Sequence, residues 1–270
     1  MEKEETDSFH FKAFCNLDDS PDADFLIHSM DVMSSLPCIQ WIKNQAIDSM
    51  LLKKGDRILE VGCGQGADTE KIAEKITPGV VTAIDLSQRM ISEAKKRTQF
   101  PNVIYQVADI FQLEHQAYFS ACYADRLLVS HADYQDIFSK IMQLVKPKGK
   151  ICITDVDALS IMILPYNSVT QLIISQILKA FVNPDMGKKL PALFYGNNLK
   201  NIHVRKNISS IKDFSVLSQI FQFPVILKEL INEEIITQQQ ASDWVKIAHE
   251  ASRNGTFLYT VTFSTAIGEI

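Results

Sequence analysis

The stretch RILEVGCGQGADTEKIAEKI, residues 57–76, decides the fold. Its first five residues are rich in Ile, Leu and Val, which predicts a buried strand. Three glycines follow within five positions, and helical spacing of apolar residues begins directly after them. A strand that leads through a glycine-rich turn into a helix is typical of the first unit of a parallel α/β sheet. The glycines permit a tight turn and let a ligand approach the backbone near a helix N-terminus.

The same alternation of strand and helix continues on both sides of this stretch. Strands are expected at 57–61, 80–84, 103–107, within 118–129 and at 150–154, and helices at 65–76, 88–98 and 134–145. Helices of 10–15 residues between strands imply βαβ units, hence a parallel sheet with helices on both faces. Ligands of such sheets bind beyond the carboxyl ends of the strands.

The flanking segments have a different pattern. Residues 1–20 lack periodicity and are expected to form a loose tail, and 22–52 predict two helices separated at Pro37. Beyond Asp157 we expect further helices and two strands. These are a long apolar helix over 160–181, a short helix after 183–191, a strand near 202–207, helices within 210–254 and a terminal strand over 256–267.

Composition and charge exclude several classes of protein. The 270 residues are 46% apolar and 22% charged, as in a soluble globular protein, and the net charge is −5. No cluster of four basic residues occurs, which disfavours a nucleic-acid partner because backbone binding needs a cationic face. No apolar run reaches 18 residues and the N-terminus is acidic, so neither a membrane span nor a secretory signal is expected.

Cysteine usage indicates the compartment. The five cysteines are odd in number and form no CxxC pair, which predicts reduced, mostly buried thiols in a cytoplasmic protein without a zinc site. They are Cys15, Cys38, Cys63, Cys122 and Cys152.

Two ligand classes fit the glycine turn. Gly62, Gly64 and Ala67 satisfy the dinucleotide pattern GxGxxG/A, and Asp85 stands where a nicotinamide enzyme places its ribose-binding acid. Two acids are not part of that dinucleotide pattern and favour a different ligand. Glu60 precedes the glycines, and Asp109 follows the next expected strand. A nicotinamide-dependent oxidoreductase therefore stays an alternative.

The motifs as a set resemble the class I S-adenosylmethionine-dependent methyltransferases, in their small-molecule branch. The resemblance spans about 55–155 and extends more loosely to NPDMGKKLP (183–191) and FLYTVTFSTAIG (257–268). It is carried by ILEVGCGQG (58–66), AIDLS (83–87), VADI (107–110), DRLLVSH (125–131) and LVKPKGK (144–150). It implies a doubly wound, seven-stranded, mostly parallel sheet whose last strand is antiparallel, with helices on both faces and an added helical cap.

The same resemblance implies a single methyltransferase domain over 1–270. Its parts would be an N-terminal tail and helices (1–52), a cofactor-binding half (53–157), a substrate-side helical cap with one strand (158–254) and a terminal strand (255–270).

The resemblance also assigns site residues by position. Asp85 would bind the ribose hydroxyls, Leu86 and Met90 would flank the adenine, and Asp109 with Ile110 would hold the adenine edge. An ionised Asp suits two hydroxyl donors, since it accepts both through charge-assisted bonds. The full set of expected cofactor contacts is Glu60, Gly62, Gly64, Gln65, Gly66, Asp85, Leu86, Met90, Ala108, Asp109, Ile110 and Arg126.

Each assignment has a structural alternative. Asp85 could cap the next helix, although Ser87 is better placed for this, and Asp109 could begin a turn. His131, just past the fourth expected strand, is a candidate general base or a packing residue. Arg126 is a second catalytic candidate, and its guanidinium could face either the cofactor's carboxylate or a surface acid. Asp155 and Asp157 are expected to end the fifth strand at the same cleft.

The predicted chemistry is an in-line methyl transfer to an O, N or C atom of a small acceptor, without a metal. The protein's part in such a transfer is mainly alignment and exclusion of water. Apolar residues of the expected cap, including Phe181 and Phe221, would roof an uncharged or amphipathic acceptor. A protein that binds the cofactor without turnover stays a third possibility, and a homo-oligomer is possible.

Overall fold

The computed structural model describes residues 17–270, so the first sixteen residues, with Cys15 and most of the expected tail, lie outside the described part. The elements are α1 Ala23–Ser35, α2 Pro37–Ser49, β1 Arg57–Val61, α3 Ala67–Ile76, β2 Val80–Asp85, α4 Gln88–Arg97, β3 Val103–Val107, β4 Phe119–Asp125, α5 Tyr134–Leu144, β5 Val145–Leu164, α6 Ser168–Lys179, α7 Met186–Gly196, β6 Lys200–Ile211, α8 Phe214–Ser218, α9 Phe223–Asn232, α10 Gln238–Arg253 and β7 Leu258–Glu269. Strands β1 to β5 lie at the positions expected from the sequence, and the expected helices follow β1, β2 and β4.

The strands form one seven-stranded sheet in the order β3-β2-β1-β4-β5-β7-β6. The pairs from β3 to β5 are parallel, and β7 runs antiparallel to both β5 and β6. The expected doubly wound sheet with an antiparallel last strand is therefore confirmed. Strand order reverses between β1 and β4, and the crevice at such a reversal is where open α/β sheets bind ligands.

Side-chain alternation along the strands builds a core on each face of the sheet. In β1, Ile58 packs with Ile47 of α2 and Ile72 of α3, whereas its neighbour Leu59 belongs to the cluster that holds Ile141 of α5. Successive strand residues point to opposite faces, so each face receives its own layer of helices. This arrangement confirms helices on both faces.

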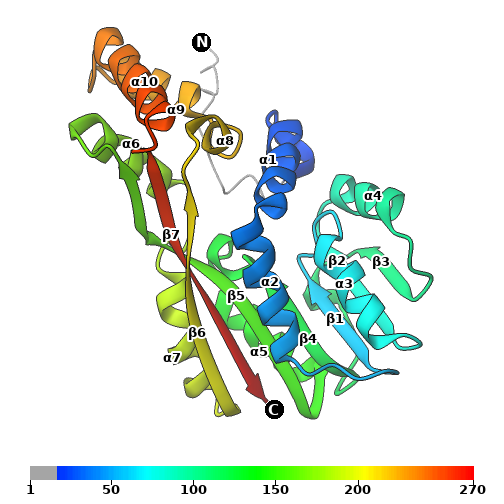
Figure 1. Ribbon diagram of the computed structural model, residues 1–270. Helices are drawn as coiled ribbons and strands as arrows, with labels where there is room; N and C mark the ends of the chain where they lie inside the picture. Colours follow the sequence, from blue (N-terminus) through cyan, green and yellow to red (C-terminus); the bar gives the residue numbers. More distant parts are fainter. Residues whose placement is uncertain (1–16) are drawn as a thin grey trace, which may run out of the picture.

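Three strands are much longer than the others. Figure 1 shows β5, β6 and β7 running beyond the rest of the sheet, with α6, α9 and α10 gathered at their far end. The cap is thus an extension of the sheet's antiparallel side, covered by helices.

One expected helix is wrong in its first part. Residues 160–164 continue β5, and the helix of this region, α6, begins at Ser168. Ile161 and Ile163 are buried while Ser160 and Met162 are not, which is the period-two pattern of a strand. Pro165 then separates this strand from α6, because proline disrupts a helix interior.

The longer strand also corrects the expected position of two acids. Asp155 and Asp157 lie inside β5, and neither is at its end. Asp155 is fully buried and its carboxylate accepts hydrogen bonds from the backbone N–H groups of Val129 and Val156. The bond from Val129 links the segment after β4 to β5.

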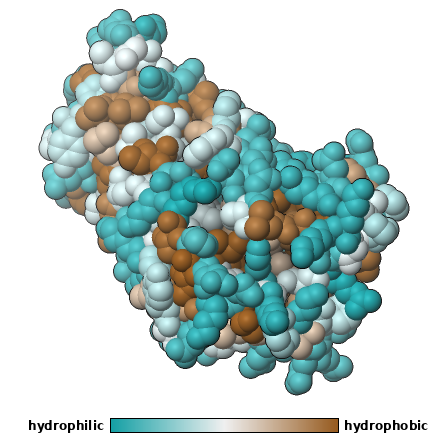
Figure 2. All heavy atoms as spheres, turned by 60° about the horizontal axis from the view of Figure 1, so that its bottom comes forward, coloured by the Kyte–Doolittle hydropathy of each residue, from teal (hydrophilic) through white to brown (hydrophobic). Residues whose placement is uncertain are grey.

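The surface carries exposed hydrophobic side chains among polar ones, including Ile208 and Leu51. Figure 2 shows one face on which hydrophobic residues form separate patches between hydrophilic ones. Among residues 17–270, no helix is long and apolar enough to cross a membrane. The four described cysteines are free thiols, and three of them are buried.

Candidate active site

The glycine turn after β1 is held by backbone geometry that favours glycine. Gly62, Gly64 and Gly66 all have positive φ, at +71°, +53° and +82°. The N–H groups of Gly62 and Cys63 both donate to the carbonyl of Ile84 in β2. The turn is therefore fastened to the end of the neighbouring strand, where Asp85 follows.

Asp85 joins the glycine turn to the start of α4. Its carboxylate accepts from the N–H of Gly64 at 2.9 Å and from the N–H of Ser87 at 2.9 Å. Ser87 is the N-cap of α4, and its hydroxyl accepts from the N–H of Met90. Ser87 and not Asp85 therefore caps this helix, as its position in the sequence favoured. Burial raises the pKa of the Asp85 carboxyl above its ordinary value.

A cavity of about 340 Å³ opens beside this turn, within the usual size range of small-molecule sites. Its walls come from α1, α2, the carboxyl ends of β1, β2 and β4, and three strands of the antiparallel side. These strands contribute Val156 of β5, Ser209 and Ile211 of β6, and Tyr259, Val261 and Phe263 of β7. Predicted residues that line it are Gly62, Gly64, Asp85, Leu86, Met90, Ala108, Asp109, Ile110, Arg126, His131, Phe181 and Phe221.

A small polar hollow of about 40 Å³ adjoins the cavity and shares Met30, Gly62, Asp125 and Arg126 with it. Glu60 and Gln65 line this hollow. The Gln65 side-chain N–H donates to the carbonyl of Ile27, which leaves Gln65 Oε1 as an acceptor. Glu60 Oε2 and Gln65 Oε1 are both buried and have no hydrogen-bond donor among the described residues. Buried acceptors of this kind are costly unless a ligand supplies donors.

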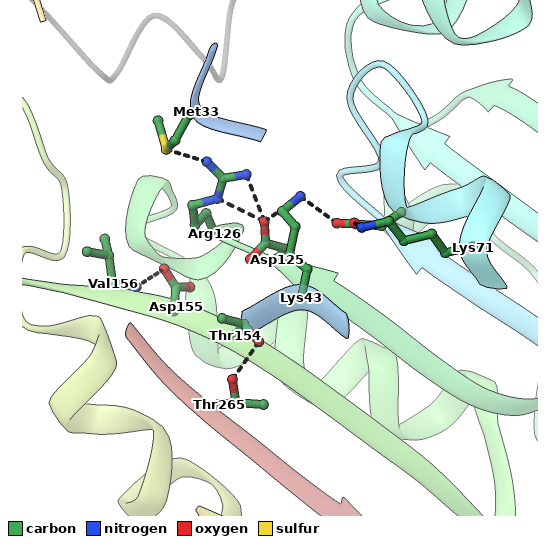
Figure 3. Close-up of polar contacts among 10 residues, drawn as sticks. Met33, Lys43, Lys71, Asp125, Arg126, Thr154, Asp155, Val156 and Thr265 are labelled. Atoms are coloured by element: carbon green, nitrogen blue, oxygen red, sulfur yellow. Dashed lines mark hydrogen bonds and ion pairs between the residues drawn. The ribbon is translucent and has the colours of Figure 1, made fainter. Parts of the chain in front are cut away.

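A buried ion-pair network forms the wall between cavity and hollow (Figure 3). Lys43 of α2 lies 2.5 Å from Asp68 of α3 and 3.2 Å from Asp125 at the end of β4. Arg126 donates through Nε and Nη2 to the same Asp125 carboxylate, both at 2.8 Å. Burial alone would raise the pKa of Asp125, but Arg126 and Lys43 bring it below its ordinary value. The network is therefore charged.

His131 is fixed in one tautomer by its surroundings. Its Nδ1 lies 2.8 Å from the carbonyl oxygen of Leu127, which can only accept, so Nδ1 carries the proton of the neutral ring and Nε2 the lone pair. Asn183, from the loop before α7, donates to the carbonyls of Leu128 and His131. The segment after β4 is thus held from two sides.

Not every expected contact faces the main cavity. Glu60 and Gln65 face the hollow, and Gly66 lines neither space. A Cβ at Gly66 would overlap the Tyr105 hydroxyl, so this glycine serves close packing beneath the turn. Asp109 lines the cavity and also accepts from the N–H of Phe111, so its turn-forming alternative holds at the same time.

Sequence reasoning missed the residues that close the site from outside the first strands. Asp125 repeats the pattern of an acid at a strand end that identified Asp85, and this signal could have been used. Lys43 and Met33 lie on helical segments whose pattern only predicted amphipathic helices. Nothing in their sequence spacing distinguishes them from solvent-facing or core residues.

Comparison with known proteins places this geometry in a family. Residues 52–202 match the family model described as "Methyltransferase domain", which covers more than half of the chain. The chain belongs to this methyltransferase family. The resemblance stated from the motifs is confirmed, and the oxidoreductase alternative is set aside.

Curated relatives cover part of the chain. It is 32% identical over 122 residues to a ubiquinone biosynthesis O-methyltransferase of Coxiella burnetii, over 44% of this chain and 51% of that protein. It is 34% identical over 112 residues to phosphoethanolamine N-methyltransferase 3 of Arabidopsis thaliana, over 40% of this chain and 23% of that one. The chain therefore spans about half the length, or less, of these relatives.

Solved structures share the fold at low sequence identity. The YcgJ protein of Bacillus subtilis matches with a TM-score of 0.61 and 15% identity, over 85% of this chain and 98% of that one. Phosphoethanolamine N-methyltransferase 2 of Haemonchus contortus matches with a TM-score of 0.59 and 17% identity, over 94% of this chain and 60% of that one. These likenesses extend the agreement in fold beyond residues 52–202.

Proposed function

We propose that this protein transfers a methyl group from S-adenosylmethionine to a small-molecule acceptor at the cavity beside Gly62 and Gly64. The observation that carries the proposal is the set of unpaired acceptors in the polar hollow, Glu60 Oε2 and Gln65 Oε1. The methionine end of this cofactor carries an ammonium group, whose N–H donors match Gln65 Oε1. Burial raises the pKa of Glu60 to about 8 in the free protein, and the positive charge of the ammonium would favour the ionised carboxylate, which then accepts as well. Gly62 of the glycine turn lines both the hollow and the cavity, and Asp85 lines the cavity.

The charge of the main cavity supports the same ligand. Its described lining carries four carboxylates, Asp85, Asp109, Asp125 and Asp133, against one guanidinium, Arg126, and one imidazole. A cationic sulfonium suits such a lining, whereas the pyrophosphate of a dinucleotide would face repulsion. Asp85 would accept from the ribose hydroxyls, Leu86 and Met90 would contact the adenine, and Asp109, with Ala108 and Ile110, would line its edge.

The chemistry that the cofactor supplies is a methyl group already activated by the positive charge of its sulfur. The residues of this chain then have to align the acceptor's lone pair with that methyl carbon and exclude water. Met33, Ile39 and Phe221 provide apolar walls for the exclusion. Arg126 uses Nε and Nη2 for Asp125, and one N–H of Nη1 donates to Met33 Sδ. The second N–H of Nη1 is therefore the donor with which it would bind the cofactor's carboxylate.

His131 is the group that we assign to proton removal. With Nδ1–H donating to the Leu127 carbonyl, Nε2 is the ring nitrogen that would take up a proton, and the residue lines the cavity. An acceptor hydroxyl would pass its proton to Nε2 as its oxygen takes the methyl group. His131→Ala is then expected to lower turnover about 100-fold, the lower end of what general base catalysis contributes, while S-adenosylhomocysteine affinity stays within twofold.

Incubation with S-adenosyl-[methyl-³H]methionine and a panel of small-molecule acceptors tests the proposal. We expect label in a small molecule and no label with the Gly64→Asp variant, whose carboxylate would enter the cavity. Label that appears only in nucleic acid, or saturable binding of NAD in place of the cofactor, would contradict it. A protein that binds cofactor but labels nothing across a wide panel would support the non-catalytic alternative.

The domain organisation and the metal requirement are also part of the proposal. We propose that residues 53–157 form the cofactor-binding half and 158–254 the substrate-side cap of a single domain. The transfer is proposed to be independent of metals, so EDTA should leave the rate unchanged. Cytoplasmic location, absence of a nucleic-acid partner and a possible homo-oligomer remain expectations from the sequence.

A further inference from the structure

The cavity continues away from the glycine turn along one face of the antiparallel strands. Phe263, Val261 and Tyr259 alternate along β7 and all line it. Their partners Val156, Ser209 and Ile211 line the same face, as the strand register requires. From Phe263 to Tyr259 this wall runs about 13 Å, at roughly 3.3 Å per residue. We call it the distal wall, and it consists of these six residues.

The distal wall contains no ionisable group except the Tyr259 hydroxyl. The acids of the cavity lie at its other end, at the carboxyl edges of β2 and β4 and in the loops after β3 and β4. Arg126, the one guanidinium of the described lining, is paired with Asp125. A charged or phosphorylated acceptor would find no counter-ion along the distal wall, and burying an unpaired charge is costly.

Tyr259 differs from the other buried polar groups of this region. It is 6% exposed, and burial raises the pKa of its hydroxyl. The hydroxyl makes no hydrogen bond with any residue in the described part of the chain, whereas Ser209 lies 3.2 Å from Cys38 Sγ. The ring packs against Phe221 with centroids 5.7 Å apart, so the hydroxyl stands at an apolar end of the cavity.

We infer that the methyl acceptor is an uncharged, mostly apolar molecule whose end far from the reacting atom carries a hydroxyl or carbonyl group, which Tyr259 binds. This inference rests on the proposed function for the location of the acceptor. The distal wall would pack against the apolar body, and the Tyr259 hydroxyl would select molecules that satisfy it. Tyr259 is thus a specificity-determining residue.

The Tyr259 hydroxyl adds no hydrogen bond to the free protein among the described residues, and the residue lines the cavity. Tyr259→Phe should therefore melt at the same temperature as wild type or higher. Tyr123→Phe is the control, because the Tyr123 hydroxyl is buried without a partner among the described residues and lines neither the cavity nor the hollow.

Three fluorescent probes test the inference: 2-naphthol, naphthalene and 2-naphthyl phosphate, titrated into protein saturated with S-adenosylhomocysteine. Wild type and Tyr123→Phe should bind 2-naphthol about tenfold more tightly than naphthalene, the value of one hydrogen bond in a dry site. The phosphate should bind more weakly than naphthalene. In Tyr259→Phe the preference for 2-naphthol over naphthalene should fall to about twofold or less.

Contrary outcomes are equally specific. Tighter binding of 2-naphthyl phosphate than of 2-naphthol, an unchanged preference in Tyr259→Phe, or no measurable binding of 2-naphthol would each overturn the inference. Calorimetry with S-adenosylhomocysteine alone is run on every variant. Failure of that binding in wild type would count against the proposed function, and the naphthol comparison would then be repeated without it.

Discussion

Among single residues, the acids of the site differ in charge state and in hydrogen-bond partners because their surroundings differ. Asp125 is charged between Lys43 and Arg126, whereas Glu60 has no donor for one of its oxygens. Burial raises the pKa of Glu60 to about 8 and that of Asp85 above its usual value. The sequence predicted Asp85 from its place after a strand, but it could not predict that Asp125 is paired with Lys43, because that partner lies on α2, about eighty residues earlier in the chain.

Asp85→Asn separates the ligand-binding role of this residue from its structural one. The amide oxygen still accepts from one of the two backbone N–H groups, and the amide nitrogen cannot accept from the other, so stability should fall by only about 0.5–1.5 kcal/mol, the net value of one hydrogen bond. Affinity for S-adenosylhomocysteine should fall by about 1.5–3 kcal/mol, the range for hydrogen bonds to a charged group. Calorimetry and thermal melting measure the two quantities. Equal losses of affinity and stability would show that Asp85 only fastens the glycine turn.

Glu60 makes the free energy of unfolding depend on pH. Its folded pKa of about 8 lies above the unfolded value of 4.5, so the folded state keeps a proton that the unfolded chain releases between these values. Its contribution is complete below about pH 4.5 and is lost as pH rises to about 8.

Glu60→Gln removes that dependence. The variant should match wild type near pH 5 and become more stable than wild type as pH approaches 8, with a constant difference above this. Urea unfolding across pH 5–9 measures it, with the exposed Glu74→Gln as control. A stability difference that does not vary with pH would show that Glu60 is ionised throughout.

At the scale of elements, the strand–turn–helix units of the first half follow from local pattern alone. The expected strand 103–107 coincides with β3, and the expected helix 134–145 ends one residue beyond α5. The error at 160–164 has a tertiary cause, because β5 is extended there by pairing with β7 almost a hundred residues later. Local propensity contains no information about a strand that is so distant in the sequence. The apolar run that begins at 160 fits a buried helix as well as a buried strand.

The glycine turn gives a prediction at this scale. Gly66→Ala should destabilise the fold by about 2–4 kcal/mol, since it adds left-handed backbone strain to an overlap with Tyr105. Gly55→Ala is the matched control, because Gly55 also has positive φ but no atom lies within 4 Å of its Cβ position. It should cost only the strain, about 1–2 kcal/mol.

Chemical denaturation measures both glycine variants, and Tyr105→Phe should reduce the cost of Gly66→Ala by removing the hydroxyl. Equal costs for the two glycines would show that Gly66 is needed for its backbone conformation and not for close packing.

At the scale of the whole molecule, the site is assembled from distant parts of the chain. Met33, Arg126, Phe221 and Tyr259 line one cavity although they are spread over more than two hundred residues. The cofactor half could be predicted because its residues follow consecutive strands. The acceptor half could be predicted only as an apolar cap, since its shape depends on how far β6 and β7 extend beyond the rest of the sheet (Figure 1) and on the link between α8 and α9, whose Ile220 and Phe221 line the cavity.

Methyl transfer at this cavity requires that the cofactor bind at the glycine turn. Calorimetric titration of S-adenosylhomocysteine into wild type and Gly64→Asp measures it. Gly64 has a φ of +53°, which Asp tolerates better than most residues, and the nearest atom to its Cβ position is the flexible end of Met30, so the variant should fold. We predict one saturable site in wild type and none in Gly64→Asp, with unchanged circular dichroism. Binding of wild-type strength in Gly64→Asp, or no binding in wild type, would contradict the account.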